Sequence, residues 1–251
     1  MVGKLPRVVR TLAFPIAMIE IQNLSKSFSR GPFSAPTAVL RGVSFQAPDG
    51  AVTGLIGANG AGKTTLFKLC AGLLSPDGGQ VQVCGIDPSK RPEAARANLS
   101  LLPENAGLPS DWTGRDILRA AAALRGVFGA EASRRMHQSI ELLQLERFIG
   151  RPARGYSRGQ TVRVALAREA VAQAQCLILD EPTVGLDFES AARVRSWVRS
   201  LAQDGRCVLI STHIVSEIEA MCDQMVGLRE GVAHDDADTR KWISDARLGV
   251  F

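Results

Sequence analysis

The feature that most constrains the fold is a glycine-rich segment at residues 57–65, which reads Gly-Ala-Asn-Gly-Ala-Gly-Lys-Thr-Thr. It has the G-x-x-x-x-G-K-[ST] spacing of a phosphate-binding loop. The apolar run at 52–56 predicts a buried strand before it, and residues 65–74 predict a helix after it. Glycines let several backbone N–H groups point into one concavity, and the following helix adds its positive end. A glycine-rich turn can carry this spacing by chance, but the flanking strand and helix favour the phosphate site.

The residues of this loop are assigned to binding a triphosphate and its metal. Lys63 is expected to reach the β- and γ-phosphates, and the Thr64 hydroxyl to bind Mg²⁺. The predicted binding set in the loop is Gly57, Asn59, Gly60, Ala61, Gly62, Lys63, Thr64 and Thr65.

A pair of carboxylates forms the second motif. Asp180 and Glu181 follow the apolar run 176–179, so they are expected at the tip of a buried strand. Asp180 is predicted to hold Mg²⁺, and Glu181 to polarise the water that attacks the γ-phosphate. Such a pair also occurs in ordinary turns, but the phosphate loop in the same chain favours the metal-and-base interpretation.

Two further segments add candidate phosphate ligands. Residues 156–160 (Tyr-Ser-Arg-Gly-Gln) precede a predicted helix at 159–173, so Ser157 and the first N–H groups of that helix form an anion site, although alone they indicate a plain helix cap. His213 follows the apolar run 207–211, and at that strand tip it is placed to donate a hydrogen bond to the γ-phosphate. A lone histidine is more often structural, as is expected for His137 and His234.

Alternating strands and helices predict an α/β fold with a mostly parallel sheet, and ligands bind such sheets at the carboxyl ends of the strands. The other elements expected are half-buried strands at 19–28 and 39–47, short strands at 80–85, 99–102, 225–228 and 231–234, an inserted helical subdomain beginning with 114–144, and helices at 188–203 and 214–222.

Composition limits the class of protein. The 251 residues suffice for one large domain or a core with a subdomain. A net charge of +5 without a dense basic run is compatible with an anionic ligand or a membrane-adjacent surface, and is weak support for nucleic acid. Five scattered cysteines without a C-x-x-C favour reduced thiols over a disulfide framework or a zinc site. No apolar run is long enough to span a bilayer.

Together these motifs resemble the ATP-binding-cassette (ABC) ATPase family, from about residue 19 to 234. The order agrees: phosphate loop at 57–65, signature segment at 156–160, Asp180-Glu181, a D-loop at 185–187 and a switch histidine at His213. The resemblance assigns Asp187 of the D-loop to the nucleotide-binding set. The Leu-Pro-Glu pattern at 102–104, the modified signature at 156–160 and residues 183–187 are most similar to the exporter-type branch that includes the NatA-like ATPases. The resemblance implies a P-loop NTPase (RecA-like) core, an N-terminal antiparallel β subdomain and an inserted α-helical subdomain.

The resemblance also implies partners. Two copies would enclose two ATP molecules head to tail, with Ser157, Gly159 and Gln160 of one copy facing the phosphate loop of the other. Phe28 stands where the family places an aromatic side chain on the adenine, whereas considered alone it would be assigned to the core. A separate transmembrane permease would be driven from the cytoplasmic face of the membrane.

Three positions depart from the family pattern. Tyr156 replaces a leucine, and Arg158 stands where glycine is frequent. Glu104 stands where glutamine is usual, near the Mg²⁺ and the nucleotide, so it either binds the metal more directly or weakens ATP binding.

The predicted function is therefore ATP hydrolysis coupled to transport, and the resemblance to this branch implies export as the direction. A protein acting on nucleic acid or ribosomes ranks lower, because there is one cassette and no heptad run, and the intact catalytic set opposes a non-catalytic sensor. The expected domains are a tail at 1–17, with Met18 as the functional start, an ATPase domain at 18–235 containing a helical subdomain at about 105–170, and a short tail at 236–251.

Overall fold

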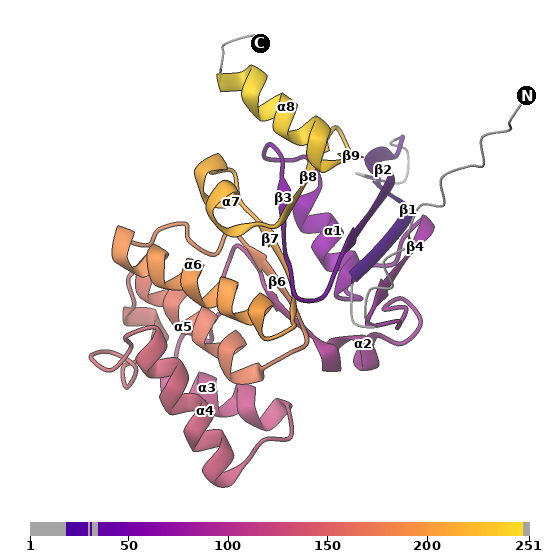
Figure 1. Cartoon of the computed structure of the whole chain (residues 1–251). Helices are drawn as coiled ribbons and strands as arrows, with labels where there is room; N and C mark the ends of the chain where they lie inside the picture. The colour runs from indigo at the N-terminus through magenta and orange to yellow at the C-terminus, as the bar shows by residue number, and fades with distance from the viewer. Residues whose placement is uncertain (1–18, 30, 32–34, 248–251) are drawn as a thin grey trace, which may run out of the picture.

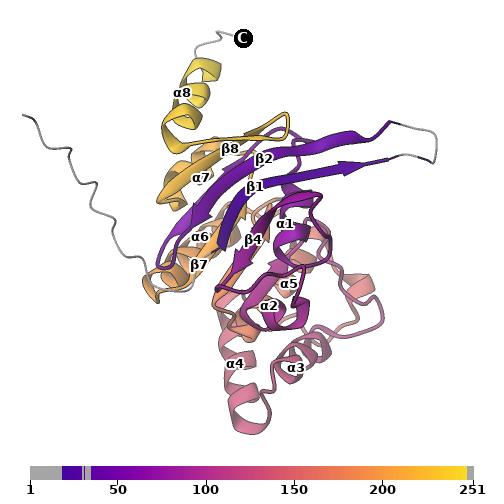
Figure 2. The same cartoon turned by 90° about the vertical axis from the view of Figure 1, so that its right-hand side faces the viewer.

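The protein is built around two β-sheets that share one hydrophobic layer (Figures 1 and 2). This computed structural model describes residues 19–29, 31 and 35–247, so the predicted tail at 1–17 and Met18 lie outside the described residues. The smaller sheet is antiparallel, in the order β2-β1-β4, with β1 at Ile19–Phe28, β2 at Thr37–Ala47 and β4 at Gly78–Val83.

The larger sheet has the order β5-β6-β7-β3-β8-β9, and its first five strands run parallel. Its strands are β3 (Val52–Ile56), β5 (Leu99–Leu102), β6 (Cys176–Asp180), β7 (Cys207–Ser211), β8 (Gln224–Arg229) and β9 (Val232–His234). The segments that follow β3, β6 and β7 therefore emerge at one edge of the sheet.

Both faces of this sheet are covered. Along β6, Cys176 and Ile178 contribute to the core beneath the antiparallel sheet, whereas Leu177 and Leu179 contribute to the core beneath the helices. This alternation follows from the period of two in a strand. The prediction that the apolar strands belong to a parallel sheet covered on both faces is confirmed.

The helices are α1 (Lys63–Cys70), α2 (Pro92–Asn98), α3 (Gly114–Leu124), α4 (Gly129–Leu142), α5 (Arg158–Ala172), α6 (Phe188–Gln203), α7 (Val215–Met221) and α8 (Asp236–Arg247), with one 3₁₀ turn at Ala153–Gly155. Helices α3, α4 and α5 pack on one another at the lower left of Figure 1, away from the antiparallel sheet.

Several boundaries differ from the predicted ones for local reasons. The helix predicted at 65–74 begins at Lys63 and ends at Cys70, because Gly72 adopts φ 64° and cannot continue the helix. The strand predicted at 80–85 ends at Val83, where a turn begins. The helical run at 114–144 is divided by Gly126 and Gly129, both with positive φ, into α3 and α4.

Two helices add to the expected set. The short helix α2 was not predicted, because only Ala95 of its seven residues is buried and no apolar stripe marks it. Residues 236–247, expected to belong to a short C-terminal tail, form α8. The buried Thr239 hydroxyl accepts a hydrogen bond of 2.8 Å from the Gly227 N–H of β8.

Candidate nucleotide-binding site

The phosphate loop is shaped by glycines that no larger residue could replace. A Cβ at Gly57 would lie 2.4 Å from the Leu228 carbonyl oxygen. Gly62 adopts φ 109°, and a Cβ there would lie 2.8 Å from the Leu40 side chain. The backbone therefore curls tightly between β3 and α1, so the first N–H groups of α1 point into the loop.

Lys63 occupies the cradle that the loop forms. Its side chain is only 8% exposed, and Nζ donates to the Gly57 carbonyl at 2.6 Å and to the Ala58 carbonyl at 3.3 Å. The ammonium group thus lies among backbone dipoles inside the loop, where a phosphate oxygen would compete for it.

Asp180 is oriented by two hydroxyl groups. Thr64 Oγ1 donates to Asp180 Oδ2 at 3.2 Å, and Ser211 Oγ donates to Asp180 Oδ1. Ser211 lies opposite Asp180 in the register of β7 and β6, so the sheet itself sets this contact. Sequence reasoning assigned no role to Ser211, but its position as the last residue of a buried strand was a usable signal.

Glu181 and His213 form a pair at the strand tips. His213 Nδ1 lies 3.0 Å from Glu181 Oε1 and 3.1 Å from Oε2. Glu181 adopts the left-handed φ of 52°, and its N–H donates to the Ser211 carbonyl oxygen at 3.1 Å. A non-glycine residue in this conformation is strained, and such strain is found where neighbouring structure fixes a functional side chain.

A buried glutamate that sequence reasoning missed ties the two catalytic loops together. Glu217 Oε2 accepts from Thr183 Oγ1 at 2.6 Å and from Thr212 Oγ1 at 3.2 Å. Thr183 follows the Asp180-Glu181 pair, and Thr212 precedes His213. The available signal was weak: an acidic residue four positions after the switch histidine, within a predicted helix.

These groups meet in one cleft of about 420 Å³. Its lining comprises Val39, Ala58, Asn59, Gly60, Gly62, Lys63, Thr64, Thr65, Glu104, Arg158, Asp180, Glu181, Val184 and His213. The structure therefore brings Glu104 together with the phosphate loop and the acidic pair. It also adds Arg158, whose stem passes 3.1 Å from the position of a Cβ on Gly185.

Apart from Arg158, the signature segment lies outside this lining and forms the capped start of α5. Ser157 Oγ accepts from the Gln160 N–H at 3.3 Å, and Gln160 Oε1 accepts from the Ser157 N–H at 3.1 Å, which makes a reciprocal cap. Tyr156 connects this segment to the start of α3, because its hydroxyl accepts a hydrogen bond from the Gly114 N–H at 3.0 Å. The same hydroxyl donates to the Arg151 carbonyl at 2.9 Å.

The remaining predicted ligands also lie outside the lining of this cleft. Gly57 and Ala61 shape the loop without lining it, Gly159 packs on the Gly185 carbonyl, and Phe28 is 40% exposed with Lys26 Nζ 5.7 Å from its ring centre. Asp187 caps α6 and accepts from the Ser190 N–H at 2.8 Å, and this hydrogen bond holds the pKa of the Asp187 carboxyl below its usual value.

The donor set fits a magnesium ion. Thr64 and Asp180 supply a hydroxyl and a carboxylate oxygen at one point of the cleft, and Glu104 supplies a second carboxylate on its wall. In triphosphate sites Mg²⁺ is usually bound by a few oxygen donors from the protein together with the phosphates.

Comparison with known proteins identifies the family. The family model described as "ABC transporter" matches residues 40–184, which include the phosphate loop, the signature segment and the acidic pair. The chain belongs to the ABC transporter family. A Nod factor export ATP-binding protein I of Burkholderia lata is 34% identical over 217 residues, covering 86% of this chain and 69% of that protein. The ABC transporter ATP-binding protein NatA of Bacillus subtilis is 31% identical over 193 residues, covering 76% and 78%.

Solved structures agree with the fold. An ATP-binding subunit of an ABC transporter superposes with a TM-score of 0.80 at 29% identity, covering 90% of this chain and 93% of that one. A dimeric bacterial ABC transporter cassette superposes with a TM-score of 0.79 at 20% identity, a likeness that shows the fold alone. The predicted family, P-loop NTPase fold and ATPase class are confirmed. Among residues 19–29, 31 and 35–247, no helix has the length and apolar character to cross a bilayer.

Proposed function

We propose that this ABC ATPase powers export by a separate membrane subunit, and that two copies of it close head to tail around two ATP molecules. One observation carries the proposal. A single chain gathers Lys63, Asp180, Glu181 and His213 in one cleft, while Ser157 and Gly159 do not line it. The phosphate cage of one copy is thus left open on the side that the signature segment of a second copy would cover.

Each residue of the cleft has a role that follows from its contacts. Lys63 would exchange its bonds to the loop carbonyls for phosphate oxygens, because a charge-assisted bond is the stronger one. Glu181 would accept the proton of the attacking water, and His213 orients its carboxylate. Thr64 and Asp180, with Glu104 beside them, would hold Mg²⁺, which when bound neutralises charge on the phosphates.

The signature segment would serve the partner's nucleotide. Its cap leaves the Ser157 side chain exposed at the N-terminus of α5, a helix of 15 residues with its positive end toward the solvent. The Ser157 hydroxyl would donate to an incoming γ-phosphate oxygen, while Ser157 Oγ continues to accept from the Gln160 N–H. Dimeric cassettes with the same fold support this arrangement.

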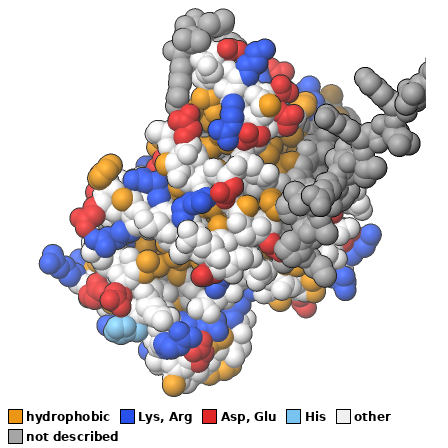
Figure 3. Space-filling model, viewed as in Figure 1, with side chains coloured by type: hydrophobic (Ala, Val, Ile, Leu, Met, Phe, Trp, Pro, Cys, Tyr) orange, Lys and Arg blue, Asp and Glu red, His pale blue; other side chains and the backbone are white. Residues whose placement is uncertain are grey.

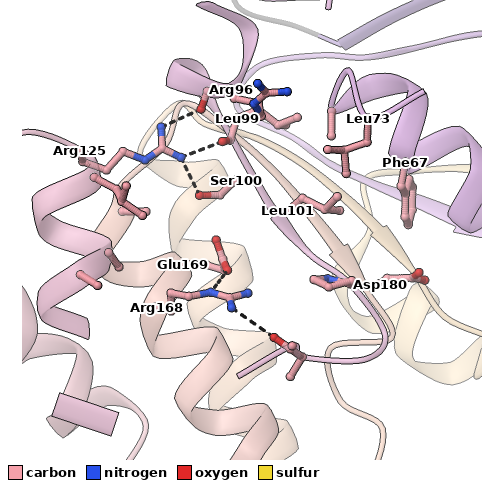
Figure 4. A pocket seen from close by; sticks show the side chains of 18 of the residues that line it. Phe67, Leu73, Arg96, Leu99, Ser100, Leu101, Arg125, Arg168, Glu169 and Asp180 are labelled. Carbon is pink, nitrogen blue, oxygen red and sulfur yellow. Dashed lines mark hydrogen bonds and ion pairs between the residues drawn. The ribbon is translucent and has the colours of Figure 1, made fainter. Parts of the chain in front are cut away.

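A second, apolar groove offers the surface for the membrane subunit. It measures about 1240 Å³ and extends from Thr64 and Asp180 to the helical region (Figure 4). Leu73, Trp112 and Leu124 line it although 58%, 47% and 88% of their surfaces are exposed. Exposed apolar side chains gathered in a groove favour a protein partner, here a cytoplasmic helix of the permease.

Two arginines at this groove connect the helical region to β5 and to the segment that carries Glu104. Arg125, the residue that caps the C-terminus of α3, donates to the Leu99 carbonyl at 2.7 Å and to Ser100 Oγ at 3.2 Å, so it connects the helical region to β5. Arg168 of α5 donates to the Ala106 carbonyl at 3.2 Å, next to the segment that carries Glu104 (Figure 4). A helix pushed into the groove would therefore act on the segment that reaches the nucleotide.

Relatives support the proposed direction of transport. One is named for Nod factor export and is similar over most of this chain, which supports export, and another is the ABC transporter ATP-binding protein NatA. A position at the cytoplasmic face of the membrane is part of the same proposal. The transported molecule would bind to the membrane subunit, so no residue of this chain is assigned to it.

The decisive test of the dimer uses Glu181→Gln, which keeps the shape of the side chain but cannot take the proton. We expect this variant to form a stable dimer with Mg²⁺-ATP and a monomer with ADP, measured by light scattering after size-exclusion chromatography. Glu189→Gln, an exposed change on α6, is the matched control and should hydrolyse ATP normally. A Glu181→Gln protein that stays monomeric at saturating ATP, or that turns over at the wild-type rate, would contradict the proposal.

The membrane partner is tested by co-purification with a polytopic protein encoded beside this chain. Leu124→Asp places a charge in the groove and should abolish capture, while leaving ATP binding unchanged. Phe128→Asp, 69% exposed but outside the groove lining, is its control. Equal capture by both variants would remove the groove as the docking surface.

Action on nucleic acid is the weaker alternative. On the face in Figure 3, acidic and basic side chains are intermixed, without the basic stripe that a phosphate backbone requires. Binding to nucleic acid that weakens steeply with salt would favour this alternative.

A further inference from the structure

A pair of thiols lies where the two sheets meet, far from the nucleotide cleft. Cys84 Sγ and Cys176 Sγ are 3.4 Å apart. Cys84 follows β4 of the antiparallel sheet, and Cys176 is the first residue of β6 in the central sheet. They are separated by roughly ninety residues of sequence, so the contact is a product of the fold.

The backbone holds Cys84 in this position. Cys84 and Gly85 are the two central residues of a tight turn, with φ of 50° and 70°. Val83 and Ile86 close that turn with reciprocal N–H to carbonyl bonds of 2.8 and 2.9 Å. Asparagine and glycine are the residues that this left-handed geometry favours, so the turn does not explain a cysteine.

The two thiols differ in access in a way that suits stepwise oxidation. Cys84 is half-buried at the surface, whereas Cys176 is fully buried behind it. The hydrogen bond from Cys176 lowers the pKa of the Cys84 thiol, against the opposing effects of burial and of Asp49. By contrast, burial raises the pKa of Cys70 and of Cys222 to about 12. The accessible member of the pair is thus also the more readily ionised one.

We propose that Cys84 and Cys176 are a modification site, which hydrogen peroxide converts reversibly into an intramolecular disulfide. The Cys84 thiolate attacks one peroxide oxygen and breaks the O–O bond, giving a sulfenic acid and hydroxide, which takes a proton and leaves as water. The Cys176 sulfur then displaces the sulfenic hydroxyl group. That hydroxyl leaves as water with the Cys176 proton, so two thiols are oxidised and one peroxide is reduced to two waters.

The bond would fasten β4 to β6 and so clamp the antiparallel sheet onto the central sheet. Closing a loop of this length constrains the unfolded chain strongly, and we expect the melting temperature to rise by about 5 °C or more. Cys176 stands at the opposite end of β6 from Asp180, about 13 Å away at the usual rise per residue. ATP turnover should therefore change less than about twofold.

The experiment treats the full chain with graded hydrogen peroxide, blocks remaining thiols with N-ethylmaleimide, and maps the cross-link by mass spectrometry without reduction. Trypsin leaves Cys70 and Cys84 in one peptide, so cleavage before Asp77 is used to separate them. Cys84→Asn is the main variant, because asparagine suits the turn and folding is preserved. Cys222→Ser, which removes a half-buried thiol elsewhere, is the matched control.

The wild-type protein and Cys222→Ser should give a Cys84–Cys176 cross-link, a mass lower by two hydrogen atoms and a higher melting temperature, all reversed by dithiothreitol. Cys84→Asn should show none of these. The proposal is overturned if Cys84 accumulates sulfinic acid without the cross-link, if Cys176 pairs with the neighbouring Cys207 instead, or if Cys84 joins two chains.

Discussion

Replacing Glu217 with alanine should loosen both catalytic loops at once. The carboxylate accepts hydrogen bonds of 2.6 Å from Thr183 and 3.2 Å from Thr212, and all three side chains are buried. Arg195 lies 3.9 Å from the other carboxylate oxygen, too far for a hydrogen bond. The substitution thus removes the shared acceptor that holds the loop after β6 against the loop after β7.

The magnitude follows from these contacts. A hydrogen bond to a charged group contributes roughly 1.5–3 kcal/mol, and removing the buried carboxylate also relieves its desolvation, so we expect a net loss of about 2–3 kcal/mol. For a chain of this size each kcal/mol lowers the melting temperature by about 2–4 °C, which gives a fall of roughly 5–10 °C. Turnover should fall by at least about tenfold, because the Glu181–His213 contact depends on both loops.

Differential scanning fluorimetry and steady-state phosphate release measure the two effects. Ser216→Ala, the exposed neighbour on α7, is the control and should match the wild type in both. A Glu217→Ala protein with a melting temperature within about 2 °C of the wild type and unchanged turnover would refute the role given to this carboxylate.

Three further predictions concern the signature segment, α8 and the metal. Tyr156→Phe leaves the buried Gly114 N–H without its acceptor, so the melting temperature should fall by roughly 3–10 °C; an unchanged value would contradict this role. The hydrogen bond from Arg240 lowers the pKa of Asp236, so the ionised carboxylate stabilises the fold above about pH 4, and this stabilisation is lost as the pH falls. The difference in melting temperature between the wild type and Asp236→Asn should therefore shrink between about pH 5 and 3. A difference that stays constant over this range would exclude the stabilising role of Asp236. EDTA should abolish turnover and Mg²⁺ restore it, with Thr64→Ala needing about tenfold more Mg²⁺; an unchanged requirement would remove Thr64 as a metal ligand.

The phosphate loop could be predicted from the sequence because its signal is local. The motif lies within residues 57–65, and the buried strand before Gly57 and the helix beginning at Lys63 adjoin it in the chain. The helix ends and the division of 114–144 depended on positive φ at particular glycines, which a periodic pattern does not register.

The contacts that complete the site could not be predicted, because they join distant segments. Ser211 meets Asp180 only through the strand register, and Glu217 reaches Thr183 across 34 positions. Arg158 was noted as a departure from the family pattern, but its approach to the cleft depends on how α5 packs beside Gly185. The roles of the individual residues and the domain boundaries remain predictions.

The central claim is that one chain provides only part of each phosphate cage. A structure of Glu181→Gln with Mg²⁺-ATP tests it most directly. We expect a head-to-tail dimer in which Lys63 of one copy and Ser157 of the other both lie within hydrogen-bond distance, about 3 Å, of the same γ-phosphate. A nucleotide-loaded monomer, or a dimer in which Ser157 is remote from every phosphate, would contradict it.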